Sequence, residues 1–171
     1  MNKIQMVKAF EALDPFVPTH TKLLLGGGGA MVLAHGFPLA TQDLDALFYQ
    51  SQITEKDVWG AIQDIALNLS LPKDWLNPYF QIFLYTLPQD YESRLITVFT
   101  GKNLTVNALG IEDLLILKCF ANREKDIGHA RALIKKGANI DLIERHINDM
   151  LDKGMPKSME AKDFLDDLLD E

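Results

Sequence analysis

Leu23–Phe48 has the sequence LLLGGGGAMVLAHGFPLATQDLDALF, which predicts a buried strand, a glycine turn, a short apolar helix and a second strand. The second strand contains Asp43 and Asp45, whose side chains are expected to point the same way, roughly 6–7 Å apart, because side chains alternate along a strand. The glycines Gly26–Gly29 allow a ligand to approach the backbone closely and leave free N–H groups at a helix start. The stretch therefore predicts a phosphate-binding turn beside two carboxylates that suit Mg²⁺.

The glycine run departs from two familiar phosphate-binding patterns. A Walker loop closes with Gly-Lys-Ser/Thr, whereas this chain continues Gly29-Ala30-Met31, and a dinucleotide fingerprint needs a third glycine where Met31 or Val32 stands. A flexible strand-to-helix turn, and a solvent-facing strand edge for the two acids, therefore remain alternatives. A functional role for Asp43 and Asp45 is favoured over these alternatives, because Asp is poorly suited to an apolar strand.

The composition is that of a folded domain with one core and a net charge of −7 across 171 residues. This charge argues against a broad nucleic-acid-binding face, although six basic residues lie between Lys118 and Lys136. A single cysteine, Cys119, excludes an internal disulfide and fits the cytoplasm. No apolar run is long enough to cross a bilayer, so no membrane partner is expected.

Hydrophobic periodicity predicts an α+β fold with a small mixed sheet and a helical C-terminal part. Strands are expected at 22–25, 43–49, 80–85, 95–99 and 104–109, and helices at 3–13, 30–34, 54–69, 111–121, 124–136, 140–151 and from 158 onward. In the helix over 54–69, Thr54 is the expected N-cap and Trp59 is expected on the inner face. Lys118 is the single charge in the apolar stretch Leu114–Ala121, where a lysine either reaches solvent or meets an anion or carboxylate.

Two blocks together resemble the nucleotidyltransferase superfamily with a polymerase-β-like palm. The first is Gly27-Gly28-Gly29-Ala30 followed by Thr41-Gln42-Asp43-Leu44-Asp45, and the second runs from Glu112-Asp113-Leu114 through Lys118 to Arg123-Glu124-Lys125-Asp126. More narrowly, the chain is similar to minimal bacterial nucleotidyltransferases, including AbiEii-type toxin relatives. This resemblance implies a palm domain over 1–110 and a helical region over 111–171 packed on it.

The resemblance also implies a function and roles for individual residues. Asp43 and Asp45 would be the catalytic carboxylates and would hold Mg²⁺, while Gly27, Gly28, Thr41 and Lys118 would contact the nucleotide. The reaction would transfer a nucleoside monophosphate from a nucleoside triphosphate to an unknown acceptor, such as RNA, a protein hydroxyl or a small molecule. A role in a toxin–antitoxin pair, with an antitoxin as protein partner, is a further expectation.

One departure from the family pattern keeps a second hypothesis open. The relatives carry a third carboxylate on a neighbouring strand, but residues 95–99 and 104–109 contain none, and their nearest polar residues are Thr97 and Asn107. The alternative is a catalytically degenerate palm that survives as a nucleotide-binding or protein-interaction module.

Overall fold

The computed structural model describes residues 1–170, and these fall into two compact units. Unit 1 comprises Met1–Gln81 and Arg94–Leu109, and unit 2 comprises Ile82–Ser93 and the residues from Gly110 onward. Each unit has its own buried core and is described in turn.

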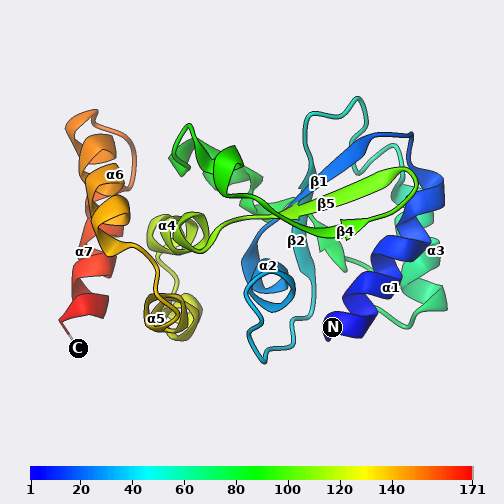
Figure 1. The fold of residues 1–171 in the computed structure, drawn as a ribbon, viewed down its shortest axis with the longest axis horizontal. Helices are drawn as coiled ribbons and strands as arrows, with labels where there is room; N and C mark the ends of the chain where they lie inside the picture. The colour runs from blue at the N-terminus through cyan, green and yellow to red at the C-terminus, as the bar shows by residue number, and fades with distance from the viewer. Residues whose placement is uncertain (171) are drawn as a thin grey trace. The chain divides into compact units, whose positions relative to one another are not determined.

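Unit 1 is built on a mixed sheet whose strand order is β3-β2-β1-β5-β4 (Figure 1). Its strands are β1 (Thr21–Leu25), β2 (Leu44–Phe48), β3 (Leu76–Asn77), β4 (Ile96–Thr100) and β5 (Leu104–Ala108). The central β1 pairs antiparallel with β2 and parallel with β5, β3 runs parallel to β2, and β4 runs antiparallel to β5. The predicted α+β fold with a small mixed sheet is confirmed.

Three helices belong to the same unit, namely α1 (Lys3–Leu13), α2 (Gly27–Leu33) and α3 (Trp59–Asn68). Asn2 starts α1 with a capping box, because its side chain accepts from Gln5 N and the Gln5 side chain accepts from Asn2 N. Helix α1 lies beside α3 (Figure 1). It reaches the sheet through Phe10, whose ring centroid is 5.7 Å from that of Phe99 on β4. Burial of this apolar face holds the helices to the sheet.

Unit 2 is helical and is arranged around one buried helix. It contains α4 (Ile111–Ala121), α5 (Ile127–Lys135), α6 (Ile140–Asp152) and α7 (Ser158–Leu169). Every residue of α4 from Asp113 to Phe120 is buried, because α5, α6 and α7 all pack against it. A helix that is apolar on all sides requires such enclosure.

No helix within residues 1–170 is both long and apolar enough to cross a membrane.

The helix expected over 54–69 begins later than predicted. Thr54 does not cap it, because the Thr54 amide and hydroxyl both donate to the Asp57 carboxylate, at 2.7 and 2.9 Å, and close a separate turn. Helix α3 starts at Trp59, whose side chain is 52 % exposed rather than on the inner face. The local bonds between Thr54 and Asp57 therefore prevail over the predicted cap.

The strand expected over 80–85 is a 3₁₀ helix, Tyr79–Thr86. Gln81 N donates to Pro78 O and Leu87 N donates to Leu84 O, both across three residues. Phe80, Phe83 and Thr86 are buried at the same three-residue spacing, so the buried positions match the 3₁₀ period.

The end of α1 is fastened to the turn between β4 and β5 by Asp14. Its carboxylate accepts the backbone N–H groups of Lys102, Asn103 and Leu104 at 3.0, 2.8 and 2.7 Å. Burial by itself would raise the pKa of Asp14, but these bonds and the nearby Lys102 charge outweigh it and lower the pKa below its ordinary value.

Replacing Asp14 by Ala is expected to lower the free energy of unfolding by about 1–2 kcal/mol at pH 7, because three N–H groups lose a charged acceptor. Since the pKa of Asp14 is lower in the folded chain, its stabilisation is complete above the unfolded-state pKa and is lost as the pH falls through the folded-state value. The two proteins should therefore begin to converge in urea titrations below about pH 4 and become equal only below the folded-state pKa of Asp14. Asp64→Ala, at an exposed acid on α3, is the control and should change little; equal losses in both variants would contradict the role of Asp14.

Candidate functional site

The glycine turn after β1 lies directly against the carboxylate of Asp45. Gly26 N donates to Asp45 O at 2.8 Å, which continues the pairing of β1 with β2. Gly27 follows with φ +53°, and a Cβ at this residue would lie 2.1 Å from Asp45 Oδ2. Glycine is therefore favoured at residue 27 for two reasons, the left-handed backbone conformation and the close contact with the carboxylate.

The next glycine lies against Thr41 in the segment that leads into β2. A Cβ at Gly28 would come 3.3 Å from Thr41 Cβ. The Thr41 hydroxyl donates to Asp43 O at 2.9 Å and lies 3.4 Å from Asp43 Oδ1. The backbone of Met1 also pairs with Thr41, because Thr41 N donates to Met1 O and the Met1 amino group donates to Thr41 O. Met1 thus helps to hold the segment that carries Asp43.

The other side of the Asp43–Asp45 pair is formed by β3. This strand is two residues long and pairs Asn77 with Asp45 in parallel register. The Asn77 side chain reaches Asp43, and its Nδ2 donates to Asp43 Oδ2 at 2.8 Å. Asn77 therefore stands on a strand adjacent to the two acids, where the family resemblance implies a third carboxylate.

Carboxylate oxygens of Asp43 and Asp45 are the groups in this site that could hold a metal ion. Both residues are partly exposed, and Mg²⁺ binds through one or two carboxylates together with phosphate oxygens and water. Among residues 1–170, no three or more His, Cys, Asp or Glu side chains are grouped so that they could hold an ion. The donor set thus suits a cation whose remaining ligands come from a phosphate-bearing substrate and solvent.

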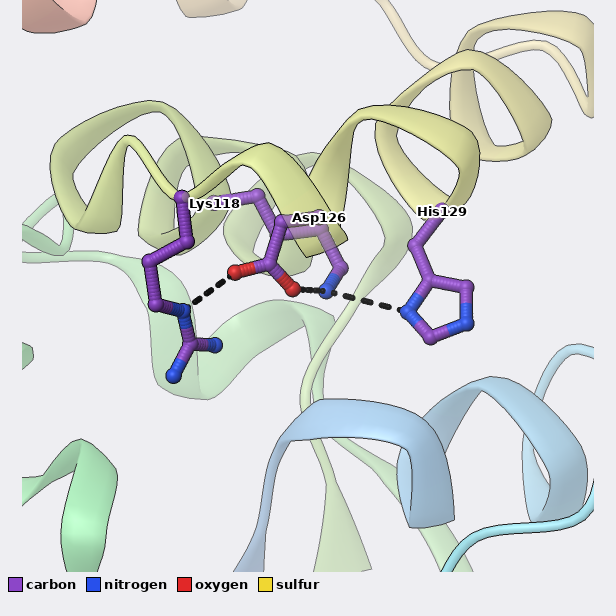
Figure 2. A network of polar contacts seen from close by, with 4 residues as sticks. Lys118, Asp126 and His129 are labelled. Atoms are coloured by element: carbon purple, nitrogen blue, oxygen red, sulfur yellow. Dashed lines mark hydrogen bonds and ion pairs between the residues drawn. The ribbon is translucent and has the colours of Figure 1, made fainter.

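Lys118, on α4 in unit 2, meets a carboxylate. Its Nζ lies 2.7 Å from Asp126 Oδ1, and both side chains are almost fully buried. Arg123 Nε donates to Asp126 Oδ2 at 2.5 Å. The Lys118 Nζ lies 3.5 Å from His129 Nδ1, and Figure 2 shows Lys118, Asp126 and His129 together. One acid is therefore held between two cations.

Electrostatics within this cluster favour an ionised Asp126 and a neutral His129. Burial opposes the charge of Asp126, but hydrogen bonds and attraction from Arg123 and Lys118 outweigh it and lower the pKa of Asp126. Burial and repulsion by Lys118 lower the pKa of His129, against a smaller opposing effect of Asp126. A neutral ring whose Nδ1 lacks a proton can then accept from the lysine.

The structure brings five of the six predicted site residues together in unit 1. Gly27 lies against Asp45, Gly28 lies against Thr41, and Thr41 bonds to Asp43. The sixth, Lys118, belongs to unit 2 and is paired with Asp126, so its contact with a nucleotide stays a prediction.

The polar residues of β4 and β5 form a ladder of neutral groups. The Thr97 hydroxyl donates to Asn107 Oδ1 at 2.8 Å, and Asn107 Nδ2 donates to the Tyr49 hydroxyl at 2.6 Å. The site residue that sequence reasoning missed is instead Asn77. Its one signal is its place just before Pro78, since a residue preceding proline favours an extended backbone.

Comparison with known proteins gives one assignment. Residues 4–167 match the family model described as "Nucleotidyltransferase of unknown function (DUF6036)". The comparison with curated proteins gives no match, and neither does the comparison with solved structures.

Replacing Gly27 by Ala tests the contact between the glycine turn and Asp45. Gly36→Ala is the matched control, because Gly36 also has a positive φ, +67°, but a Cβ there meets nothing within 4 Å. Gly36→Ala should cost about 1–2 kcal/mol of unfolding free energy from backbone strain alone. Gly27→Ala should cost at least about 1 kcal/mol more, because the Asp45 carboxylate must move. Equal losses in urea titrations would show that the contact does not constrain the turn.

Replacing Asp126 by Asn tests the buried ion pairs of unit 2. The variant leaves Lys118 buried without a counter-charge, so unfolding free energy should fall by about 3–5 kcal/mol. Asp149→Asn removes an exposed pair with Lys153, separated by 2.6 Å, and should cost no more than about 0.5 kcal/mol. Because the pKa of Asp126 is lowered, the wild-type advantage should disappear as the pH falls through that pKa. Similar losses for the two variants at pH 7 would contradict the buried role of Asp126.

Proposed function

The chain belongs to the family of nucleotidyltransferases of unknown function that matches residues 4–167, and from that premise we propose that unit 1 binds a nucleoside triphosphate with Mg²⁺ and transfers its nucleotidyl group. The observation that carries this proposal is the position of Gly27 against the Asp45 carboxylate, with Asp43 bonded to Thr41 beside it. These are the residues that the family resemblance assigns to the nucleotide and the metal.

The charges explain why a cation belongs to the proposal. Two carboxylates repel a triphosphate, because all of these groups are negatively charged. A divalent ion between the carboxylates and the triphosphate is therefore needed for the triphosphate to bind at this site. When bound, Mg²⁺ would orient the triphosphate and neutralise charge that develops during transfer. Asp43 and Asp45 would hold it through their carboxylate oxygens.

The remaining residues of the site would act by position. Gly27 and Gly28 have no side chains, so the phosphates can come close to the turn while the Thr41 hydroxyl fixes the Asp43 segment. In the transfer, an acceptor oxygen bonds to the α-phosphorus as the bond from that phosphorus to the bridging oxygen of the β-phosphate breaks. Pyrophosphate leaves and the acceptor proton passes to water. Catalysis of this kind consists mainly of positioning and charge stabilisation.

The acceptor is proposed to be a small molecule or a protein hydroxyl in preference to RNA. The net charge of −7 disfavours a long polyanion. A role in a toxin–antitoxin pair, as in AbiEii-type relatives, is a finer proposal that association with a separately expressed antitoxin would support.

Asn77 favours one alternative function. The strand beside the two acids carries the amide of Asn77 and not the third carboxylate that the family resemblance implies. In this alternative, the chain binds a nucleotide but does not transfer its nucleotidyl group. Release of pyrophosphate from a triphosphate, in the presence of candidate acceptors, separates this alternative from the enzyme.

Thermal unfolding with each triphosphate, with and without Mg²⁺, tests the proposed site. Near-saturating ligand should raise the midpoint by about 5 °C or more, and only when the metal is present. The isosteric double variant Asp43→Asn/Asp45→Asn should lose this shift and any transfer activity, the latter by about 100-fold or more. Asp64→Asn, on the exposed side of α3, should keep both. A wild type without a metal-dependent shift, or a double variant that retains it, would refute the site.

A further inference from the structure

Asn77 is held at both ends of its amide group. Its Oδ1 accepts the backbone N–H of Tyr79 at 3.1 Å, and its Nδ2 donates to Asp43 Oδ2 at 2.8 Å. The first bond decides which atom is oxygen, because a backbone N–H must meet an acceptor. The nitrogen therefore faces Asp43, and a nitrogen of this type does not ligate a cation.

The amide nitrogen of Asn77 matters because this residue lies next to both acids of the site. Parallel pairing sets Asn77 opposite Asp45, so the residue lies beside both acids of the site. A carboxylate of the same shape would place an oxygen against Asp43 Oδ2 at the distance where the amide now donates. Two like charges that close are tolerated only when a cation or a proton lies between them.

We infer that Asn77 is a positioning residue that limits the Asp43–Asp45 site to one divalent cation; the inference rests on the proposed function. Asp43 and Asp45 supply carboxylate oxygens for one divalent ion. A pair of divalent ions is bridged and held by several oxygen ligands, so a second ion would need a third anionic ligand. At that place Asn77 supplies an N–H hydrogen-bond donor, which cannot bind a cation.

The same hydrogen bond should also set how tightly that single ion is held. Asn77 fixes Asp43 Oδ2, so Asp43 Oδ1 is the oxygen directed away from the amide, near the Thr41 hydroxyl. Partners that orient a ligating carboxylate commonly change metal affinity by about 10–100-fold when they are removed.

Manganese binding to the full chain tests the inference, with Mn²⁺ and a non-hydrolysable triphosphate analogue as probes. Native mass spectrometry counts the ions in each protein–analogue complex, and the electron paramagnetic resonance signal of free Mn²⁺ gives the affinity. We expect one ion in the wild type, one ion held about tenfold more weakly in Asn77→Ala, and two ions in Asn77→Asp. Asn68→Asp adds the same charge at the exposed end of α3 and should behave like the wild type.

The outcomes separate this inference from the proposed function. A wild-type complex with two ions, an Asn77→Asp complex that still holds one, or an unchanged affinity in Asn77→Ala overturns the role of Asn77 while the nucleotide site stands. A wild type that binds neither analogue nor ion refutes the proposed function and the inference together. The wild-type count and the Asn77→Ala affinity decide the matter even if Asn77→Asp does not fold.

Discussion

The approach of the Asp45 carboxylate to the backbone of Gly27 is the constraint on which unit 1 depends. Strand β1 is the central strand of the sheet. After β1 the chain turns into α2, and the backbone of this turn must avoid a steric clash with Asp45 on β2. A side chain at residue 27 would occupy the space of Asp45 Oδ2, so only glycine allows this turn without moving the carboxylate. Because Gly26 N also donates to Asp45 O, the strand pairing and the position of the acid are set by one local arrangement.

Sequence reasoning predicted the parts of the fold whose signals are local. The strand before the glycine run and the periodic helices of unit 2 were predicted from residue pattern, because burial imposes a regular spacing. Two helix starts were misplaced, since α2 begins at Gly27 and not at Ala30, and α5 begins at Ile127 after a short 3₁₀ turn over Glu124–Asp126. The errors fall where competing local bonds decide the conformation. Thr54 bonds to Asp57 instead of capping α3, and 80–85 adopts 3₁₀ bonding, although its apolar residues also suit a strand. Such competition is settled by tertiary packing, which a single sequence does not display.

The candidate site was predictable in its acids and glycines but not in its third strand. Asp43 and Asp45 are conspicuous in an otherwise apolar stretch, although β2 begins at Leu44 and Asp43 lies just before it. Four consecutive glycines are conspicuous anywhere. By contrast, β3 is two residues long, and no periodicity can be recognised in two residues. Asn77 becomes part of the site only through its register with Asp45, a contact between residues far apart in the sequence. The third acid was expected in 95–99 or 104–109, but these residues lie in β4 and β5, which do not adjoin β2.

The two acids Asp126 and Asp43 show how neighbouring charges separate a structural role from a binding role. Asp126 is buried between Lys118 and Arg123, so its charge is already compensated by the protein. Within the described chain, Asp43 bonds to the hydroxyl of Thr41 and the amide of Asn77, both of them neutral. A hydrogen bond from a neutral group orients a carboxylate without cancelling its charge, and an oriented, uncompensated carboxylate attracts a cation. The difference between the partners, more than the acids themselves, therefore makes unit 1 the place to look for a metal and its nucleotide.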